Sequence, residues 1–478
     1  MVAGFLLLLG LHAPLLAGDL ICPNVFGSNM VLQRGMNVPV WGWAKPGAGV
    51  AVGFNGQTKT ATADEDGAWR VELESMQASA QGQALTISSG DESLVLDNVL
   101  IGEVWLASGQ SNMTRGLSGG VLKTLSRPHI RMVRIANGKH CKAKVGQADV
   151  DCQWKDLQRG SSAVASFFAM KLQDELKVPV GIISASWGGT QIQTWTPAEG
   201  FALLPEFRRE AENLRKQAEA HAEDARTPAG RKPKQISGGG SRYNAMIHPF
   251  VGMAMRGAIW YQGENNVGAG LKYEKMMQAL VGGWREVWGL GDFPVYFVQL
   301  APFGRYSGES LGRLWEGQLR ASRSIKNCGM AVITDVGNLK NIHPPQKKEV
   351  GERLALWALA KDYPSTELSN GGKAADLVYS GPLYKSYEIK GDTMIISFDY
   401  AETGLAYKGE TLTDIYIRGE GDTDFVPANA SIDGSTLVVS HPDGKTPQLV
   451  RMGWNKNAEP NLMNKAGLMA SPFTTAVE

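Results

Sequence analysis

The order of hydrophobic and polar positions divides the chain into three stretches of different character. From about residue 20 to residue 100, short apolar or alternating runs recur between turn sequences such as Pro46-Gly47, Asn55-Gly56 and Asp66-Gly67. Short runs with closely spaced turns are typical of antiparallel strands. The pattern predicts a small β-sandwich-like module over residues 19–100. Its predicted strands are Met30–Leu32, Val38–Trp43, Val50–Phe54, Trp69–Leu73, Leu85–Ile87 and Leu94–Leu96.

From about residue 101 to residue 364, apolar strand-like runs alternate with longer helical stretches. This alternation predicts an α/β layer fold with a mainly parallel sheet. In such sheets, ligand sites form in the loops that follow the carboxyl ends of the strands. The predicted strands are Val99–Ser108, Val180–Ser184, Met255–Tyr261, Val295–Leu300 and Met330–Thr334, and the predicted helices are Ser162–Leu176, Tyr273–Trp288, Trp315–Ile325 and Gln346–Asp362.

Short alternating runs return after residue 365 and predict a second β module over residues 365–478. Its strands are expected at Met394–Phe398, Thr413–Ile417 and Thr436–Val439. Within the middle stretch, the charged segment Pro205–Asp224 predicts a solvated helix, and the basic, Gly- and Pro-rich segment after it predicts a loop.

The N-terminal residues 1–18 are expected to form a signal peptide, which predicts a secreted or periplasmic protein. Val2–Ala17 is apolar, ends in small residues and is too short to span a bilayer, although no Lys or Arg precedes it. No later segment is long and apolar enough to span a membrane. In an exported protein Cys141 and Cys152 could close a short loop, and free buried thiols fit the sequence equally well.

Charge and composition exclude some classes of partner. The chain has 48 basic and 47 acidic side chains, and its net charge of +1 predicts no nucleic-acid partner. The seven His and four Cys show no zinc-type spacing, so no metal or other cofactor is expected. The 13 Trp and 57 Gly suit a loop-rich carbohydrate-active protein.

Candidate catalytic residues follow the first two predicted core strands. In GEVWLASGQSNM, Ser111 lies just past a strand, where its hydroxyl could act as a nucleophile if a base took its proton. Its backbone N–H could also stabilise an oxyanion. The alternative is a turn serine that caps the next helix. After the second strand, Gly188-Gly189 allows close approach of backbone N–H groups to a ligand, or forms an ordinary turn.

Two further polar loops complete the candidate site. In IWYQGENN, Gln262, Glu264 and Asn266 follow a strand, and an amide there could donate to an oxyanion or cap the loop. In DVGNLKNIH, His343 follows the last predicted core strand and could act as a general base, although most single histidines are structural. Ser111, Gly189, Gln262 and His343 thus each follow a different strand.

These segments resemble the SGNH hydrolases, and within them the sialate O-acetylesterase-like family. The specific blocks are GQSNM and WYQGE, and the resemblance also includes FGSNMVLQRGMNVPVWGWAKPG, VPVGIISASWGGTQIQTW, YNAMIHPF and RMGWNKNAEPNLMNKAGLMASPF. It implies a three-layer, flavodoxin-like catalytic domain over residues 101–364 between the two β modules. It further implies a Ser hydrolase acting on O-acetylated sugars without a cofactor. Ser111 would be the nucleophile, His343 the base, and the Ser111 amide, Gly189 and Gln262 the oxyanion hole.

The acid that would orient His343 departs from the SGNH pattern. That pattern has Asp three residues before the His, where this chain has Lys340. Asp335 is the expected acid, and it would orient and stabilise the imidazolium without taking its proton. The open alternative is a backbone carbonyl that orients the ring. Asn338, at the position where the family often has an acid, and Asn341 also lie in this loop.

The substrate and the class of protein have alternatives of their own. A sialic acid needs a cation for its carboxylate, and Arg115 and Arg313 are candidates, while Glu264 and Asn266 are candidate substrate-binding residues. Acetylxylan or another acetylated glycan is the alternative substrate. A non-catalytic carbohydrate-binding protein on a decayed esterase fold is the alternative of another class.

Overall fold

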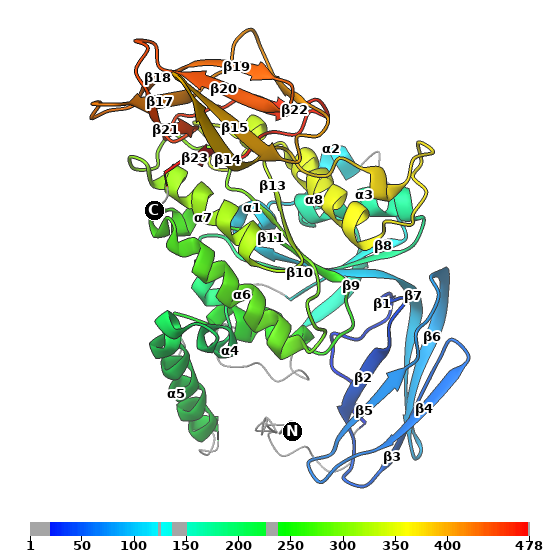
Figure 1. Ribbon diagram of the computed structural model, residues 1–478. Helices are drawn as coiled ribbons and strands as arrows, with labels where there is room; N and C mark the ends of the chain where they lie inside the picture. The colour runs from blue at the N-terminus through cyan, green and yellow to red at the C-terminus, as the bar shows by residue number, and fades with distance from the viewer. Residues whose placement is uncertain (1–19, 123–125, 136–150, 226–237, 477–478) are drawn as a thin grey trace, which may run out of the picture.

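The computed structural model of the protein describes residues 20–122, 126–135, 151–225 and 238–476 (Figure 1). The predicted signal peptide lies outside the described residues, as does Cys141, and the choice between a Cys141–Cys152 pair and free thiols therefore stays open. Within these ranges no helix is both long and apolar enough to cross a lipid bilayer.

Parallel strands form the centre of the molecule, in the spatial order β13-β12-β11-β7-β10-β8-β9. Every neighbouring pair in this order is parallel except β8 and β9, which are antiparallel. The predicted α/β fold with a mainly parallel sheet is therefore confirmed. The strands are β7 (Glu92–Gly109), β8 (Ile130–Ile135), β9 (Cys152–Asp156), β10 (Val180–Ser186), β11 (Gly257–Tyr261), β12 (Val295–Val298) and β13 (Cys328–Ala331).

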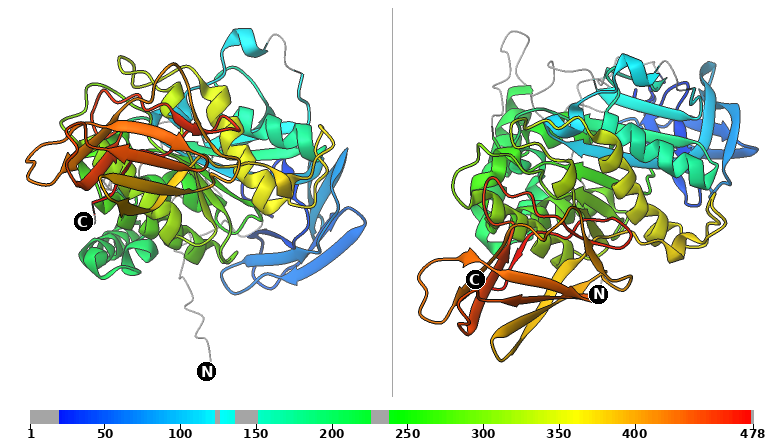
Figure 2. Two further views of the ribbon diagram at one scale, coloured as in Figure 1. Left: turned by 45° about the horizontal axis from the view of Figure 1, so that its top comes forward. Right: turned by 90° about the horizontal axis from the view of Figure 1, so that it is seen from above.

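Helices cover both faces of this sheet, which explains why its inner strands β10, β11 and β12 are almost continuously apolar. The helices are α3 (Ala163–Leu176) and α8 (Lys347–Asp362) on one face, and α6 (Lys272–Trp288) and α7 (Ser310–Ser324) on the other (Figures 1 and 2). Along β7, Trp105 and Ala107 enter the core with α3 and α8, whereas Leu106 enters the core with α6 and α7. The central domain thus has three layers.

The charged segment predicted as a helix packs on a short helix outside the central sheet. It forms α5 (Arg208–Ala225), which follows the short helix α4 (Ala198–Ala202). Helix α4 packs closely on α6, since a Cβ on Gly200 would lie 2.1 Å from the Ala279 carbonyl oxygen. In Figure 1, α5 stands at the lower left, away from the central strands.

The N-terminal β module shares its last strand with the central sheet. The first half of β7 pairs with β6 and β1, and its second half pairs with β10 and β11. Residues 100 and 101, where the sequence places a domain boundary, are neighbours within this single strand. The module's strands are β1 (Val31–Gln33), β2 (Val38–Trp43), β3 (Gly49–Phe54), β4 (Gln57–Thr62), β5 (Ala68–Leu73) and β6 (Ser79–Ser89).

Antiparallel strands build the C-terminal module around a hydrophobic core of its own. The strands are β14 (Leu383–Lys390), β15 (Thr393–Asp399), β16 (Leu405–Tyr407), β17 (Ile415–Gly419), β18 (Val426–Pro427), β19 (Asn429–Asp433), β20 (Thr436–Ser440), β21 (Pro447–Met452), β22 (Leu462–Asn464) and β23 (Phe473–Thr474). The module contacts α7, because Trp454 lies against Gly312, where an added Cβ would come within 3.0 Å of the indole. Gln299, just after β12, also donates to the Ser471 hydroxyl at 2.8 Å.

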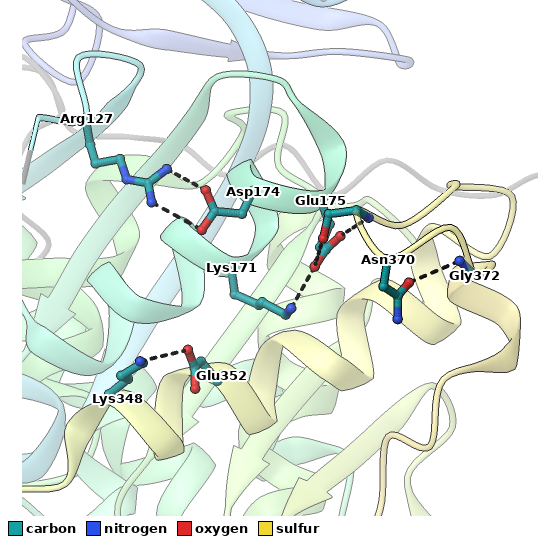
Figure 3. A network of polar contacts seen from close by, with 9 residues as sticks. Arg127, Lys171, Asp174, Glu175, Lys348, Glu352, Asn370 and Gly372 are labelled. Carbon is teal, nitrogen blue, oxygen red and sulfur yellow. Dashed lines mark hydrogen bonds and ion pairs between the residues drawn. The ribbon is translucent and has the colours of Figure 1, made fainter.

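Polar contacts tie the outer surface of α3 to the chain that leaves α8 (Figure 3). Glu175 accepts hydrogen bonds from Lys171 at 2.7 Å and from the Ser369 backbone N–H at 2.8 Å. The preceding residue, Asp174, accepts two hydrogen bonds from Arg127, which lies before β8. These contacts hold the layer formed by α3 and α8 to its connecting loops.

Candidate active site

Ser111 begins helix α1 (Ser111–Thr114) two residues after β7 ends. Gly109, the last residue of β7, has φ +139°, and a Cβ there would lie 2.1 Å from the Tyr261 carbonyl oxygen. That same oxygen accepts the Gln110 backbone N–H at 3.0 Å. Only glycine allows this close approach of β7 and β11, and the resulting sharp turn presents Ser111 at the carboxyl end of the sheet.

The loop after β10 brings backbone N–H groups beside Ser111. The Trp187 N–H donates to the Gly109 carbonyl at 3.0 Å, and a Cβ on Gly188 would lie 3.4 Å from the Ser111 Cβ. Gly189 has φ +71°, a left-handed conformation that favours glycine. Among the described residues, the N–H groups of Ser111 and Gly189 have no hydrogen-bond partner. Both are therefore available to an oxyanion.

His343 reaches Ser111 from the loop that follows β13. Its Nε2 lies 2.9 Å from the Ser111 Oγ. The loop is fixed by side chain to backbone hydrogen bonds: Asn338 Oδ1 accepts the N–H of Asn341 at 3.0 Å, and Asn341 Oδ1 accepts the N–H of His343 at 3.0 Å. The structure thus brings together the two residues that the sequence motifs single out as nucleophile and base.

Asn112, which the sequence reading did not single out, connects the serine and histidine loops. Its Nδ2 donates to the Ile342 carbonyl at 2.9 Å and to Glu264 Oε1. Its Oδ1 accepts a hydrogen bond from Lys347 Nζ at 2.6 Å. Asn112, Glu264 and Lys347 are all buried. The backbone immediately before His343 is therefore held by a buried polar cluster, which we call the Asn112 cluster and which consists of Asn112, Glu264 and Lys347.

A signal for Lys347 does exist in the sequence. The buried positions of α8 include Lys347, Val350, Gly351 and Leu354, and this i, i+3, i+4, i+7 spacing is that of an apolar helix face. A lysine on such a face needs a buried partner. The pattern therefore distinguishes Lys347 from its exposed neighbour Lys348.

Burial and positive charge shift the pKa values of the site. Burial lowers the pKa of His343 below its usual value, and the charges of Arg115 and Lys347 lower it further. Burial also lowers the pKa of Lys347 to about 8, despite the opposing effect of Glu264. Burial raises the pKa of Glu264, although the hydrogen bond from Asn112 opposes this shift. The base is consequently neutral at lower pH than an ordinary histidine.

Gln262 is buried and its amide hydrogens are already engaged. Its Nε2 lies 2.9 Å from Gln110 Oε1, 3.0 Å from the Thr190 carbonyl and 2.8 Å from Asn266 Oδ1. The Tyr273 hydroxyl donates to its Oε1 at 2.8 Å. The sequence predicts Gln262 as an oxyanion donor. In the structure its two amide hydrogens already face three protein acceptors, so neither is free for an oxyanion. Gln262 instead joins the loops behind Ser111.

Glu264 and Asn266, expected to bind substrate, bond to protein groups instead. Glu264 belongs to the Asn112 cluster. Asn266 Oδ1 accepts the Ile192 N–H at 2.9 Å, and its Nδ2 donates to Gln193. Both side chains are buried, so they hold the loops around the site in place.

Asp335 does not contact His343 in the structure. Its two carboxylate oxygens accept hydrogen bonds from Arg353 of α8 at 2.6 and 2.7 Å. Asp335 is the first residue after Thr334 in the 3₁₀ turn Thr334–Val336, so its side chain leaves the chain well before the loop turns toward Ser111. Asp335, the expected acid, is thus paired with Arg353. The His343 loop is positioned by hydrogen bonds to its backbone instead.

Arg115, the predicted substrate-binding cation, lies on the ring of His343. Its Nη2 is 3.1 Å from His343 Nδ1, and the residue is exposed. Arg313, the other candidate cation, lies on α7 beside Gly270, where an added Cβ would be 3.3 Å from the Cβ of Arg313. Arg242 stacks on Trp187, the residue before Gly188, at 4.2 Å from the ring centroid.

Within the parts of the chain that the structure describes, no group of three or more His, Cys, Asp or Glu side chains could hold a metal ion. The chemistry available to the described site consists of a hydroxyl, an imidazole, two N–H donors and an exposed guanidinium.

A family model supplies the observation that decides the identity. The model for "carbohydrate esterase, sialic acid-specific acetylesterase" matches residues 101–359, more than half of the chain. The chain belongs to this family. As a sialic acid-specific acetylesterase family member it is a carbohydrate ester hydrolase, and the matched range contains Ser111 and His343.

Relatives of this acetylesterase family member match most of its length. The sialate O-acetylesterase of Mus musculus is 28% identical over 425 residues, which cover 78% of this chain and 77% of that protein. The sialate O-acetylesterase of Homo sapiens is 27% identical over 483 residues, covering 90% and 87%. The crystal structure of a carbohydrate acetylesterase from Xanthomonas citri has a TM-score of 0.80 and 31% identity, and covers 96% of this chain and 100% of that one. The similarity therefore includes both β modules.

Proposed function

We propose that the protein hydrolyses O-acetyl esters of sialic acids, with Ser111 as nucleophile and His343 as general base. The observation that carries this proposal is the 2.9 Å contact between His343 Nε2 and Ser111 Oγ at the carboxyl end of the parallel sheet. A serine hydroxyl becomes a useful nucleophile when an adjacent base takes its proton. The family supports an acetyl ester on a sugar as the group that is attacked.

The first half of the proposed reaction forms an acetyl-enzyme. Ser111 Oγ attacks the acetyl carbonyl carbon while His343 Nε2 takes the hydroxyl proton. The backbone N–H groups of Ser111 and Gly189 donate to the oxyanion, and Gln262 supports their loops from behind. The bond to the sugar oxygen then breaks as His343 returns the proton to that oxygen, leaving the acetyl group on Ser111.

Water completes the reaction. His343 takes a proton from a water molecule, which attacks the acetyl carbon and forms a second oxyanion in the same place. Collapse of this intermediate breaks the bond to Ser111 Oγ and releases acetate, and the proton returns to Ser111. No acid side chain contacts His343 among the described residues, so its orientation is assigned to Asn341 and to the bond between Asn112 and the Ile342 carbonyl.

The deciding experiment is acetate release from O-acetylated sialic acid by the Ser111→Ala variant. We expect loss of at least about a thousandfold in kcat, the scale seen when a catalytic serine is removed. Ser118→Ala, an exposed serine seven residues on, is the matched control and should keep full activity. Equal activity of Ser111→Ala and the parent protein would instead favour a carbohydrate-binding protein on a decayed esterase fold.

The preferred sugar is tested by comparing kcat/KM for 9-O-acetylated sialic acid and for acetylated xylan. The names of the family and of the mammalian relatives favour the sialic acid. A higher kcat/KM on xylan would contradict this part of the proposal while leaving the serine mechanism intact.

We assign the central domain, residues 101–364, to the SGNH hydrolase type, with the β modules at 19–100 and 365–478 supporting it. The assignment is supported by the three layers and by Ser111, Gly189 and His343 after three different strands. Export directed by residues 1–18 remains part of the proposal.

A further inference from the structure

The contact of Arg115 with His343 Nδ1 has a consequence for the proton on the imidazole. A guanidinium carries five N–H donors and no acceptor. At 3.1 Å from Arg115 Nη2, Nδ1 must therefore act as the acceptor. A neutral imidazole has one N–H, so in this arrangement the proton is on Nε2, the atom that faces Ser111 Oγ at 2.9 Å.

This tautomer cannot carry out the proposed first step. Nε2 must have a free lone pair to take the serine proton. After that transfer each ring nitrogen would carry a proton, and the Nδ1–H would face the Arg115 cation. Lys347 adds a second positive charge near the ring. Among the described residues no carboxylate bonds to Nδ1, since Glu264 bonds to Asn112 and Asp335 to Arg353. Arg115 has to leave Nδ1 before His343 becomes a base.

We propose that Arg115 is a specificity-determining gate, which holds His343 in the unproductive tautomer until the carboxylate of an acidic sugar substrate binds the guanidinium and releases Nδ1. The inference rests on the proposed serine esterase function and adds a mechanism for substrate selection. Release lets the single ring proton move from Nε2 to Nδ1 by exchange with water, and the net charge of the ring does not change.

The properties of Arg115 suit such an exchange of partners. Arg115 ends the short helix α1, its backbone N–H donates to the Ser111 carbonyl, and its side chain is exposed. No carboxylate of the described residues pairs with it. A two-point hydrogen bond between guanidinium and carboxylate is charge-assisted and stronger than a single bond to a neutral imidazole nitrogen. A substrate carboxylate would therefore displace the ring.

The first test compares two substrates that differ only in this carboxylate: 9-O-acetyl-N-acetylneuraminic acid and its C1 carboxamide. For the parent enzyme we expect kcat/KM for acetate release to be higher on the acid by about tenfold or more, as one charge-assisted bond would give. In Arg115→Met this ratio should fall toward one, and kcat on the carboxamide and on p-nitrophenyl acetate should rise above the parent value. A variant that merely damages the site would lose activity on all three substrates.

Lys340→Met is the matched control, since Lys340 is an exposed cation in the His343 loop, and its backbone N–H, not its side chain, bonds to Asn338. It should keep the parent ratio. An unchanged ratio in Arg115→Met, or loss of activity on the neutral esters, would overturn the gate. Neither result would contradict the esterase proposal, which Ser111→Ala tests separately.

The second test reads the tautomer directly in the free enzyme by two-bond ¹H–¹⁵N correlations in protein with ¹⁵N-labelled histidine. The signal of His343 is assigned by its loss in His343→Gln. We expect the Nε2–H tautomer in the free parent protein. We expect the Nδ1–H tautomer both in Arg115→Met and in the parent protein saturated with N-acetylneuraminic acid. The Nδ1–H form in the free parent protein would overturn the proposal.

Discussion

The position of His343 is fixed mainly by hydrogen bonds to the backbone of its loop and less by contacts of its ring. Asn341 accepts its N–H, and Asn112 holds the carbonyl of Ile342 just before it. Hydrogen bonds from a buried cluster restrict the position of the ring, although they do not stabilise a positive charge on it as a carboxylate would. Burial lowers the pKa of His343, as do the charges of Arg115 and Lys347, and no carboxylate of the described residues bonds to the ring to raise it.

One residue-scale prediction concerns Asp335. We expect Asp335→Asn to change kcat by less than about threefold, because the carboxylate binds Arg353 and not His343. The lost ion pair should lower the free energy of unfolding by about 1 kcal/mol. Steady-state kinetics and thermal unfolding measure both effects, and Arg353→Met should reproduce the loss of stability. A drop in kcat of a hundredfold or more in Asp335→Asn alone would restore the role that the sequence suggested.

A second residue-scale prediction concerns pH. The neutral form of His343 is the active one, so the lowered pKa extends activity to more acidic pH than an ordinary histidine allows. Lys347→Met removes one of the charges that lower this pKa, and the acidic limb of the pH profile of kcat/KM should therefore move to higher pH. Lys348→Met, an exposed neighbour on the same helix, should leave the limb in place. A limb that does not move in Lys347→Met would contradict the charge effect.

At this scale the sequence motifs predict the meeting of Ser111 and His343, which the structure contains. The partners of Asp335 and Gln262 could not be predicted in the same way. Whether an acid reaches a histidine eight residues away depends on the path of the loop, and Gln262 differs from a free donor only through the acceptors of Gln110, Thr190 and Asn266 around it. Apart from Asn266, which lies four residues after Gln262, these partners are distant in sequence.

Among the elements, the buried strands were predictable because both faces of the sheet are covered and the strands are therefore continuously apolar. The exception is β7, which the pattern divides into Leu94–Leu96 and Val99–Ser108. Asp97 and Asn98 interrupt the apolar pattern, and Asn98 has φ +56°. The pairing with β6 shifts register there, between Gln83 and Leu85, so the strand continues through an irregularity.

The last two strands on this side of the sheet, β8 and β9, were missed for a different reason. Ile130–Ile135 alternates with arginines, and Cys152–Asp156 is short and half polar, so neither forms a continuous apolar run. Strand β8 lies between β10 and β9, and β9 is the edge strand of the sheet. Edge strands tolerate polar residues that a central strand cannot.

An element-scale prediction concerns the contact of α3 with the loop after α8 (Figure 3). Burial would raise the pKa of Glu175, but hydrogen bonds from Lys171 and Ser369 outweigh it and lower the pKa. A lowered pKa means that the ionised form stabilises the fold at neutral pH and that this contribution is lost as the pH falls through the lowered value. Glu175→Gln should therefore lower the free energy of unfolding by about 2 kcal/mol at neutral pH.

Thermal unfolding at neutral pH and at about pH 3 measures this contribution, since the difference between Glu175→Gln and the parent protein should shrink in acid. Asp174→Asn is the matched control on the adjacent, more exposed residue, and its effect should be smaller. An equal difference in melting temperature at both pH values would show that the charge of Glu175 does not contribute.

In the whole molecule, the C-terminal module is joined to the catalytic domain through buried side chains. Trp454 lies against Gly312 of α7, and Met469 belongs to the same hydrophobic core as the residues of α6 and α7. Asn457 lies close to Gly304, whose N–H donates to the carbonyl of Leu339 in the His343 loop. The module therefore contacts both the core and a loop of the site.

We expect deletion of residues 381–478 to expose this part of α7 and to abolish soluble, active protein. Trp454→Ala keeps the module and should lower the free energy of unfolding by about 3–5 kcal/mol, the usual effect of removing a buried aromatic side chain. Tyr407→Ala, an exposed aromatic residue of the same module, should have little effect. A truncated protein with the melting temperature and kcat of the full chain would contradict this role for the module.

The single strand β7 also sets an order of events during synthesis. Its first half can pair with β1 and β6 as soon as the N-terminal module has left the ribosome, because both partners precede it in the chain. Its second half, which leads to Ser111, pairs with β10 and β11, whose residues end at positions 186 and 261. Until those residues are made, an apolar half-strand extends unpaired from a folded module, and unpaired apolar strands of this kind are prone to aggregation. The nascent chain would thus be most in need of a chaperone between the completion of its first module and the arrival of β11.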